Sequence, residues 1–317
     1  AELRPDPGRS SASRHSLLSR GFCQRMDKVY TYETVLAVGP KSTPRAAPRL
    51  RYDCDKSGLR NLSQRFVQLA CDEATLRFIT DGTARHWAAE LAAEVLAALL
   101  QLCLTAADAN LLCELGQMFV LSTEQAQILI DRAGGCGRGR LLDCGAGDGN
   151  VTAQLAALGF SEVACTEVSN SAAARLREHG WICRAEELPS FAASDEPFDL
   201  VSCLNVLCRA PRPLSLLRRL CELLPPGGLM LLAIVLPFQP VVLGRCRSSS
   251  APLERFPHAL LRARSFEEGV VAFTDHVLTP MGLTACAVTR VPYCCRGTLG
   301  AFYVLDDAVF VVRRAVS

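Results

Sequence analysis

A strict succession of strand-like and helix-like segments begins after Gly139 and constrains the fold of this chain more than any other feature. Short apolar runs, typical of buried strands, alternate with segments whose apolar residues recur three and four positions apart, as in helices. This alternation predicts an α/β fold with a parallel, Rossmann-like sheet covered by helices on both faces. The predicted strands are residues 140–145, 162–169, 181–189, 198–208 and 229–238, and the predicted helices are residues 150–159, 171–180 and 213–228.

The chain as a whole divides into three parts. Residues 1–50 are rich in Pro, Ser, Ala and Arg with little periodicity, so we expect them to be disordered. Residues 51–135 are a predicted helical cap, in which residues 59–113 have helical spacing and Ser122 or Thr123 is the N-cap of a further helix. Residues 136–317 are the α/β domain, with a predicted loop-rich insertion at residues 238–265 and a predicted hairpin of residues 285–293 and 302–314.

The sequence LLDCGAGDGN, residues 141–150, places a glycine-rich loop directly after the first predicted strand. Bare backbone lets a ligand approach the main chain, and ligands of open parallel sheets bind at the carboxyl ends of the strands. Asp143, Gly145 and Gly147 lie at that end of the first strand, and Glu167 lies at the same end of the second. A carboxylate there can accept both hydroxyls of a ribose. The pattern therefore predicts a nucleoside-containing ligand, with the alternative that Asp143 and Glu167 only cap neighbouring turns.

Two details favour S-adenosylmethionine over a nicotinamide dinucleotide. The loop lacks the G-x-x-G spacing that opens a helix onto a pyrophosphate. It also contains Asp148, whose charge would repel a diphosphate but is compatible with a sulfonium ion and its amino-acid tail. We therefore predict S-adenosylmethionine as the cofactor.

Polar residues also follow the third and fourth predicted strands. Asn205 would project from the fourth strand toward the transferred methyl group, where an amide can orient a nucleophile. The alternative for Asn205 is an ordinary turn-forming residue. Glu186 and Glu187 leave the third strand toward the adenine side, with a solvated acidic loop as the alternative for at least one of them.

Composition argues against several other classes of protein. Charge is nearly balanced, with 34 Lys and Arg against 32 Asp and Glu, so we expect no nucleic-acid partner. The sixteen cysteines contain no C-x-x-C pair, so we expect no structural zinc and no other metal. The most apolar helical segment, residues 88–104, carries Glu90 and Glu94, so we expect no membrane span in this chain.

Two features are mild indications of the secretory route. Asn61-Leu62-Ser63 is an acceptor sequence for N-glycosylation, although this pattern also occurs by chance. The chain starts at Ala1 rather than Met, which is compatible with removal of a signal peptide. In a secretory protein disulfides could form among Cys54, Cys71, Cys294 and Cys295, and the sequence leaves their pairing open.

Several distant segments resemble one known family. LLDCGAGDGNVT, TEVS, FDLVSCLNVL, RVPYCC and FYVLDDAVFVV, together with GQMFVLS before the first predicted strand, resemble the DREV methyltransferases. The resemblance runs from about Tyr52 to Arg313, with the segments in the family's order. It implies a seven-strand class I methyltransferase sheet with an N-terminal helical segment, and S-adenosylmethionine as the methyl donor.

The DREV family contains a protein-histidine N-pros-methyltransferase, and the resemblance implies that activity here. The substrate would be a protein with a His-x-His sequence and a small middle residue, and the second product S-adenosylhomocysteine. Matching positions imply donor-binding roles for Asp143, Gly145, Gly147, Glu167 and Asn205.

The resemblance also assigns roles on the substrate side. Tyr293 and Tyr303 match tyrosines that line the donor and histidine pockets; from the pattern alone both would be core residues of the hairpin. We expect Asn205, Tyr303 and Cys208 as catalytic residues, and Tyr293 and Asp148 as further contacts to the donor.

This chain departs from the family on the substrate side. Cys208 stands before Arg209 where the family has Asp, and Gln239-Pro240-Val241 replaces His-Pro-Tyr. A carboxylate that could orient or deprotonate imidazole is missing, and a thiol is a weak base unless its pKa is lowered. Two alternatives therefore stay open: a catalytically weak or silent donor-binding scaffold, and a small-molecule methyltransferase of the same fold.

The expected reaction is an in-line displacement, in which a neutral imidazole nitrogen attacks the sulfonium methyl group. Imidazole is nucleophilic near neutral pH because its pKa is about 6.5, so the protein must mainly orient the ring. We expect a monomer. The resemblance implies a location in the endoplasmic reticulum or mitochondrion, with the cytoplasm as an alternative.

Overall fold

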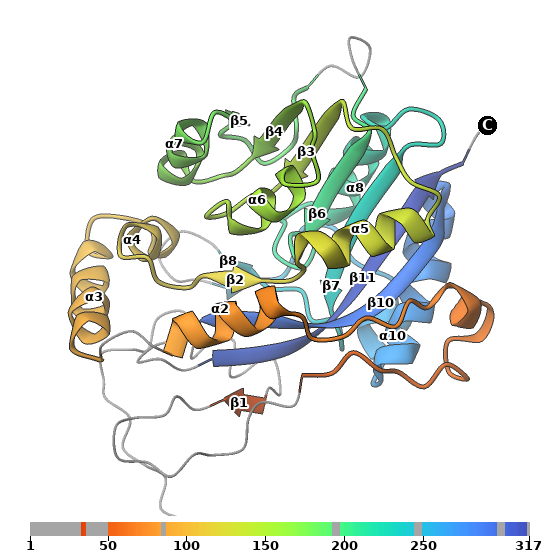
Figure 1. Cartoon of the computed structure of the whole chain (residues 1–317), viewed down its shortest axis with the longest axis horizontal. Coiled ribbons are helices and arrows are strands. Elements are labelled where there is room, and N and C mark those ends of the chain that lie inside the picture. Colours follow the sequence, from red (N-terminus) through yellow and green to blue (C-terminus); the bar gives the residue numbers. More distant parts are fainter. Residues whose placement is uncertain are drawn as a thin grey trace, which may run out of the picture.

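The computed structural model describes residues 33–35, 50–83, 87–191, 197–243, 249–296 and 302–315. One mixed β-sheet lies between two layers of helices (Figure 1). The elements, with η marking 3₁₀- and π-helical turns, are β1 (Glu33–Val35), η1 (Arg60–Arg65), α2 (Glu73–Thr83), α3 (Trp87–Leu100), α4 (Ala106–Leu112), β2 (Met118–Phe119), α5 (Thr123–Arg132), β3 (Arg140–Cys144), α6 (Asn150–Ala156), β4 (Glu162–Thr166), α7 (Asn170–Glu178), β5 (Ile182–Arg184), β6 (Leu200–Leu204), α8 (Pro213–Glu222), β7 (Leu229–Val235), β8 (Val242–Leu243), β9 (Ser249–Ser250), α9 (His258–Arg262), α10 (Phe266–Phe273), η3 (Thr274–Leu278), η4 (Thr279–Met281), β10 (Leu283–Arg296) and β11 (Phe302–Arg314).

Five central strands are parallel, as the sequence predicts. β3 pairs with β4 on one side and with β6 on the other; β4 continues to β5, and β6 to β7. The chain therefore winds outward from β3 in both directions, and the switch point lies at the carboxyl ends of β3 and β6. Every residue of β7 is buried, as expected for a strand that is covered on both faces.

β10 and β11 form the predicted hairpin and complete the seven expected strands. β11 lies antiparallel between β7 and β10. Two short strands in this sheet are additional to the prediction: β2 pairs with β10, and β1 pairs with β11, so that the sheet has nine strands among the described residues; β8 and β9 form a separate pair. β1 falls within residues 1–50, for which the sequence predicts disorder; apart from residues 33–35 and 50, that segment lies outside the described residues.

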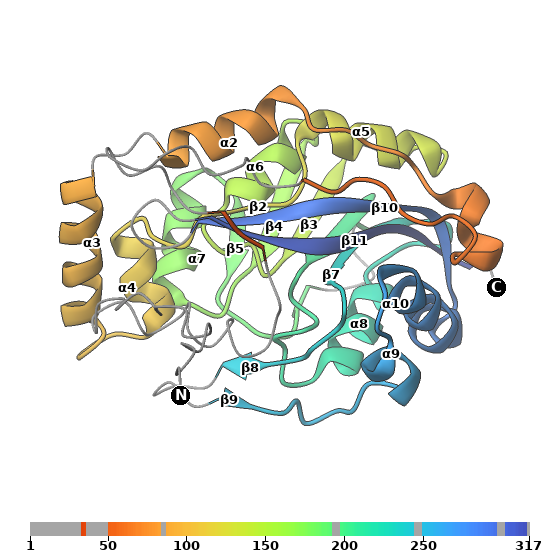
Figure 2. The same cartoon turned by 90° about the horizontal axis from the view of Figure 1, so that it is seen from below.

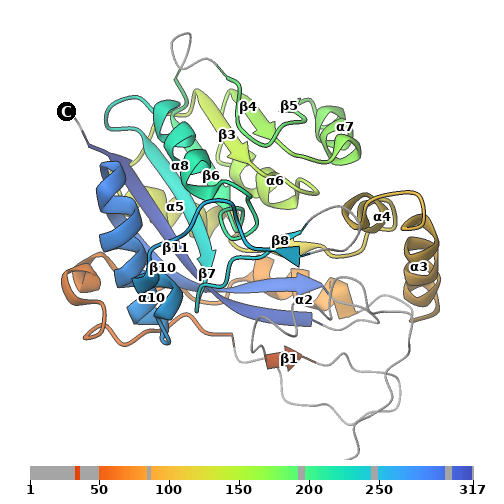
Figure 3. The same ribbon diagram turned by 180° about the vertical axis from the view of Figure 1, so that it is seen from behind.

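Helices cover both faces of the sheet and bury a core on each. On one face α5 and α6 contribute Leu129 and Leu155. On the other face α8 and α10 contribute Leu216, Leu220 and Phe273. Figure 2 shows α2 and α5 on one side of β10 and β11, with α8, α9 and α10 on the opposite side. Seen from behind in Figure 3, α3 and α4 lie together to one side of the sheet.

The predicted helical stretch of residues 59–113 is interrupted in the structure. Residues 66–72 are not helical, and the N–H of Val67 donates to the carbonyl oxygen of Val288 on β10 at 2.8 Å. Pairing with β10 satisfies this backbone in place of helical hydrogen bonds, so the prediction is wrong between η1 and α2. Among the residues that the structure describes, no helix is long and apolar enough to span a membrane.

Ser122 is the N-cap of α5, one of the two residues that the sequence predicts for this role. Its hydroxyl accepts the N–H of Gln125 at 3.0 Å, and the side-chain oxygen of Gln125 accepts the N–H of Ser122 at 3.2 Å. This reciprocal capping box defines the start of the helix. The Gln125 amide also donates to the carbonyl oxygen of Ala70 at 2.9 Å, which attaches the non-helical segment to α5.

The insertion at residues 238–265 contains the short elements β8, β9 and α9. It also supplies a cap to α8, whose own N-cap residue, Arg212, makes no side-chain capping bond. The carboxylate of Glu254 accepts the N–H groups of Leu214 and Ser215, each at 2.8 Å. A carboxylate at this end of a helix is also favoured by the helix dipole, so the insertion stabilises α8.

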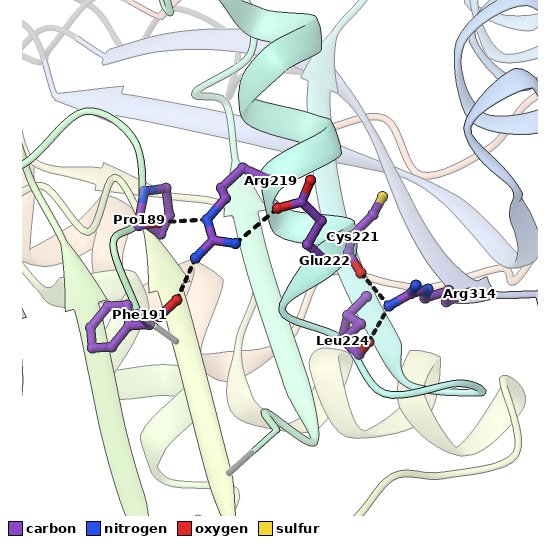
Figure 4. Close-up of polar contacts among 7 residues, drawn as sticks. All are labelled: Pro189, Phe191, Arg219, Cys221, Glu222, Leu224 and Arg314. Atoms are coloured by element: carbon purple, nitrogen blue, oxygen red, sulfur yellow. Dashed lines mark hydrogen bonds and ion pairs between the residues drawn. The ribbon is translucent and has the colours of Figure 1, made fainter. Parts of the chain in front are cut away.

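Two arginines attach α8 to neighbouring segments (Figure 4). Arg219 donates to the carbonyl oxygens of Pro189, at 2.8 Å, and Phe191, which holds the segment that follows β5. Arg314 at the end of β11 donates to the carbonyl oxygen of Leu224 at 2.6 Å, just beyond the end of α8. Cationic donors at a helix C-terminus satisfy carbonyl groups that have no partner within the helix.

A buried ion pair attaches α3 to the end of β10. Glu90 Oε1 lies 2.7 Å from Arg296 Nη2, and the two side chains are only 6% and 5% exposed. Arg296 Nη2 also donates to the carbonyl oxygen of Gly82 at 3.3 Å. The pair thus connects two cap helices to the longest hairpin of the sheet.

We predict that Glu90→Ala lowers the free energy of unfolding by about 3–5 kcal/mol, because the Arg296 charge stays buried without its partner. The matched control is Glu73→Ala, which removes an ion pair with Arg77 whose side chains are 79% and 70% exposed. An exposed pair of this kind contributes about 1 kcal/mol or less. Urea denaturation of both variants measures the difference, and equal losses would contradict the assignment.

Candidate active site

The glycine-rich loop connects β3 to α6 at the switch point. Gly145 has a φ of 74°, and a Cβ at this position would lie 2.5 Å from Cγ2 of Val206, which follows β6. Gly147 has a φ of 59°, and a Cβ there would meet no atom within 4 Å. Glycine at 145 thus permits close contact with the β6 side, whereas glycine at 147 presents bare backbone that a ligand can approach.

Asp143, at the end of β3, is buried beneath this loop. Its carboxylate accepts the hydroxyl of Ser202 on β6 and the hydroxyl of Thr152 on α6, both at 2.6 Å. Burial raises the pKa of Asp143 to about 6, although these two hydrogen bonds oppose the shift. The side chain is only 3% exposed, and its hydrogen bonds connect the end of β3 to β6 and α6.

Glu167 follows β4 and faces the loop from the neighbouring strand. Its Oε2 accepts the N–H of Gly147 at 3.0 Å, and its Oε1 accepts the N–H of Ser169 at 3.1 Å. An ionised carboxylate has about four acceptor sites, so two remain for other donors. The structure therefore brings together Glu167 and Gly147, which the sequence assigns to the same ligand.

Asp148 has a local role in the loop. Its carboxylate accepts the backbone N–H of Asn150 at 3.1 Å and the side-chain amide of Asn150 at 2.6 Å, at the first turn of α6. Burial raises the pKa of Asp148, and the bonds from Asn150 oppose that shift. Of the further acidic residues expected near the adenine, Glu186 accepts the N–H of Ser190 at 2.7 Å and Glu187 is exposed.

Asp108 on α4 contacts the start of α7 and was not singled out in the sequence. Its Oδ1 accepts the hydroxyls of Ser169 and Ser171, and its Oδ2 accepts the hydroxyl of Thr105 at 2.5 Å. These bonds hold the pKa of Asp108 below its usual value despite partial burial. The backbone N–H of Ser169 also donates to Glu167, so α4 of the cap is connected to the edge of the sheet at which β3 and β4 end. No local pattern could reveal a contact over sixty residues of sequence.

Asn205 follows β6 and is held in an unusual conformation. Its φ is 59°, its N–H donates to the carbonyl oxygen of Ala233 at 3.0 Å, and its side chain is buried. The amide Nδ2 donates to Asp307 Oδ2 on β11 at 2.5 Å. Sequence reasoning missed Asp307, although a charged residue within an otherwise apolar strand was a detectable signal.

Cys208 is buried three residues after Asn205. Its thiol donates to the carbonyl oxygen of Asn205 at 3.5 Å, and its own carbonyl oxygen accepts the N–H of Val241 at 2.8 Å. Burial raises the pKa of the Cys208 thiol, so it remains protonated near neutral pH and is a poor base. This backbone bond brings the segment after β7 next to Cys208.

Tyr293 on β10 lies near Cys208, and Tyr303 on β11 lies further along the hairpin. Tyr293 is 2% exposed, and its hydroxyl contacts the sulfur of Met118 and accepts a bond from Arg209 at 3.4 Å. Burial raises the pKa of Tyr293 well above its usual value. Tyr303 is half-buried on the same face of β11 as Asp307, about 13 Å away along the strand at 3.3 Å per residue. The structure thus places Tyr293 near Cys208 and Asp307, and Tyr303 further along the same face of β11.

Within the described ranges, the cysteines and other metal-ligating side chains form neither a disulfide nor a candidate metal site. Every cysteine described is a free thiol, including Cys54, Cys71, Cys294 and Cys295. Across the same ranges, no group of three or more His, Cys, Asp and Glu side chains could hold a metal ion. The polar groups around β3, β4, β6 and β11 are therefore the candidate active site.

Comparisons with known proteins identify the family of this chain. Residues 51–314 match the DREV methyltransferase family. Among solved structures, a S-adenosylmethionine-dependent methyltransferase of Methanosarcina mazei is 17% identical, over 57% of this chain and 95% of that chain, with a TM-score of 0.41. NodS, an N-methyltransferase of Bradyrhizobium japonicum in complex with S-adenosylhomocysteine, is 17% identical over 60% and 86%, with a TM-score of 0.37. A 1,6-didemethyltoxoflavin-N1-methyltransferase of Burkholderia thailandensis is 18% identical over 60% and 76%, with a TM-score of 0.38.

The fold and the family together define the class of protein: a S-adenosylmethionine-dependent methyltransferase with the Rossmann-like sheet of class I. More particularly, the chain belongs to the DREV methyltransferase family. The open backbone at Gly147 and the spare acceptor sites of Glu167 fit a nucleoside with two ribose hydroxyls.

We predict that Glu167→Ala weakens S-adenosylmethionine binding at least about tenfold, because charge-assisted hydrogen bonds of roughly 1.5–3 kcal/mol are lost. The matched control is Glu178→Ala, an exposed residue at the far end of α7, and it should bind the donor normally. Isothermal calorimetry measures both affinities. Equal affinity of Glu167→Ala and the unmodified chain would reject the ribose assignment.

Proposed function

We propose that this methyltransferase modifies the N-pros nitrogen of histidine in His-x-His sequences of protein substrates. The observation that carries the proposal is the buried Asn205 amide, which lies at the switch point and is held by Asp307. Such an amide can accept one ring N–H of imidazole and so select the tautomer whose other nitrogen is free to react. Membership of the DREV family, which contains a histidine methyltransferase, supports the same substrate.

The proposed donor site consists of backbone and one carboxylate. S-adenosylmethionine supplies the reactive methyl group when it is bound. Glu167 is proposed to accept the ribose hydroxyls, and Gly145 and Gly147 to let the donor approach the loop. Asp143 is proposed to hold the end of β3 against β6 and α6 through its hydrogen bonds to Ser202 and Thr152.

The chain's own residues mainly have to orient the imidazole. The ring is already nucleophilic in its neutral form, so no strong base is required before methyl transfer. Asn205 is proposed to accept the N–H of the ring nitrogen that does not react, and Tyr303 to contact the peptide further along β11. The buried thiol of Cys208 is not proposed as a base, because burial raises its pKa.

A second candidate is a donor-binding scaffold with little or no catalysis. The observation that favours it is the buried Cys208 thiol, whose raised pKa makes it a poor base where the resemblance implies an Asp. A coordinated change on the substrate side could remove histidine binding while leaving Glu167 and the loop intact. A small-molecule methyltransferase is the third candidate, because a fold does not determine its substrate.

We predict slow transfer of a labelled methyl group to a His-x-His peptide, and none to its Ala-substituted control. Cys208→Asp should raise the rate by about 10²-fold, within the range that a positioned acid or base supplies. Cys208→Asn is the matched control, because it has the same shape without the charge, and it should give no such gain.

Donor affinity, measured in parallel, should be unchanged in both Cys208 variants. Donor binding without turnover in any form would favour the silent scaffold. An active enzyme that Cys208→Asp makes no faster would show that position 208 does not need an acid.

A further inference from the structure

β11 carries two adjacent carboxylates on opposite faces of the sheet, and only one of them has an ordinary structural explanation. Asp306 pairs with Arg290 at 2.5 Å and is partly exposed. Asp307 is 0% exposed, and its hydrogen bond is the one from Asn205 Nδ2. Burying a carboxyl group that has only one hydrogen-bond partner is unfavourable. A role for Asp307 beyond the stability of the strand would explain why it is buried.

The Asn205–Asp307 pair leaves two buried oxygens without a partner among the described residues. They are Asn205 Oδ1 and Asp307 Oδ1. The φ of 59° at Asn205 is one that Asn tolerates better than most residues, so the backbone here is compatible with an ordinary turn. A pair that served only to close the end of β6 would be expected to satisfy its own polar atoms. Instead, two unsatisfied buried acceptors coincide at the switch point of the sheet.

We propose that Asp307 is a positioning residue for methyl transfer: its carboxyl group fixes the Asn205 amide so that Oδ1 accepts the N–H of the substrate ring. This inference rests on the proposed histidine substrate. The attacking nitrogen forms its bond to the methyl carbon while the carbon–sulfur bond breaks, and the electron pair of that bond goes to sulfur. The product ring is a cation whose N–H is held by Asn205, and water takes its proton after release.

The charge of Asp307 then matters most when the ring becomes cationic. The titratable and charged groups that act electrostatically on Asp307, or on which it acts, are Cys208, Arg209 and Tyr293 on its side of the sheet, and Cys294 and Asp306 from the other face. Burial raises the pKa of Asp307 to about 8, although the Asn205 bond and Arg209 lower it. Because the folded-state pKa is raised, the carboxyl group is protonated below about pH 8 and ionised above it. A carboxylate stabilises a nearby cation, so turnover should rise as the pH passes through that range.

The variant that tests this role is Asp307→Asn, which keeps the shape and removes the ionisation. We expect kcat at saturating donor and peptide to fall, above pH 8, to the value that the unmodified chain has below pH 8, because Asn cannot ionise. The rise of kcat near pH 8 should disappear, while donor affinity by calorimetry stays unchanged. The matched control is Asp306→Asn on the opposite face, which should keep the rise near pH 8. Asp307→Asn that folds and retains both the rate and the rise would overturn the proposal.

A second measurement needs neither turnover nor a variant. The side-chain amide resonances of Asn205 in the unmodified chain should shift with a midpoint near pH 8 as Asp307 ionises. Absence of such a titration would overturn the proposal, whatever the activity. A titration in a protein that methylates no His-x-His peptide would instead reject the histidine substrate while supporting the coupling of Asp307 to Asn205.

Discussion

The hydrogen bonds to the carboxylate of Asp143 hold together the edge of the sheet at which β3 and β6 end and the methyl donor is proposed to bind. It accepts one hydroxyl from β6 and one from α6, and so connects the two strands at the switch point with the helix that follows the glycine loop. Burial raises its pKa to about 6, so these hydrogen bonds only partly offset the cost of removing the carboxylate from water. An apolar side chain here would remove the acceptor of the Thr152 hydroxyl and leave Ser202 only the carbonyl oxygen of Leu142, at 3.3 Å. The loop itself is held by bonds from Gly145 to Thr166 and from Gly147 to Glu167.

The N-terminal cap shares the apolar core with the sheet, through residues such as Leu62 and Leu129, and polar contacts also attach it to the same edge. Asp108 on α4 binds Ser169, which also donates its backbone N–H to Glu167. Glu90 on α3 forms a buried ion pair with Arg296 at the end of β10. Directional contacts of this kind define a single position for the cap relative to the loop, because a shift of either partner leaves a buried charge or hydroxyl unpaired.

Local sequence patterns predicted the parts of this protein that depend on neighbouring residues. Apolar runs located β3, β4, β6 and β7 because buried parallel strands are hydrophobic throughout, and Ser122 was identifiable because a helix start needs a side-chain acceptor. Glu167 and Gly147 were assigned to one ligand because strand order alone brings the ends of β3 and β4 together. The division of residues 59–113 was not predictable, since it depends on pairing of Val67 with β10.

The unpredicted part of the site depends on contacts that cross the whole chain. Asn205 was identified from its place after a strand, but its partner Asp307 lies about a hundred residues later, on a strand whose register no local pattern defines. The same is true of Cys208 and Val241, which are joined by a backbone hydrogen bond between separate segments. Resemblance located each position, and only the fold showed which of them act together.

The central claim is that the donor lies on the glycine loop, with its ribose at Glu167 and its methyl group facing Asn205. A crystal structure of the chain with S-adenosylhomocysteine tests this most directly. The account predicts both ribose hydroxyls within hydrogen-bonding distance of the Glu167 carboxylate, and the sulfur on the side of Asn205. A nucleoside bound elsewhere, or one whose ribose makes no contact with Glu167, would contradict it.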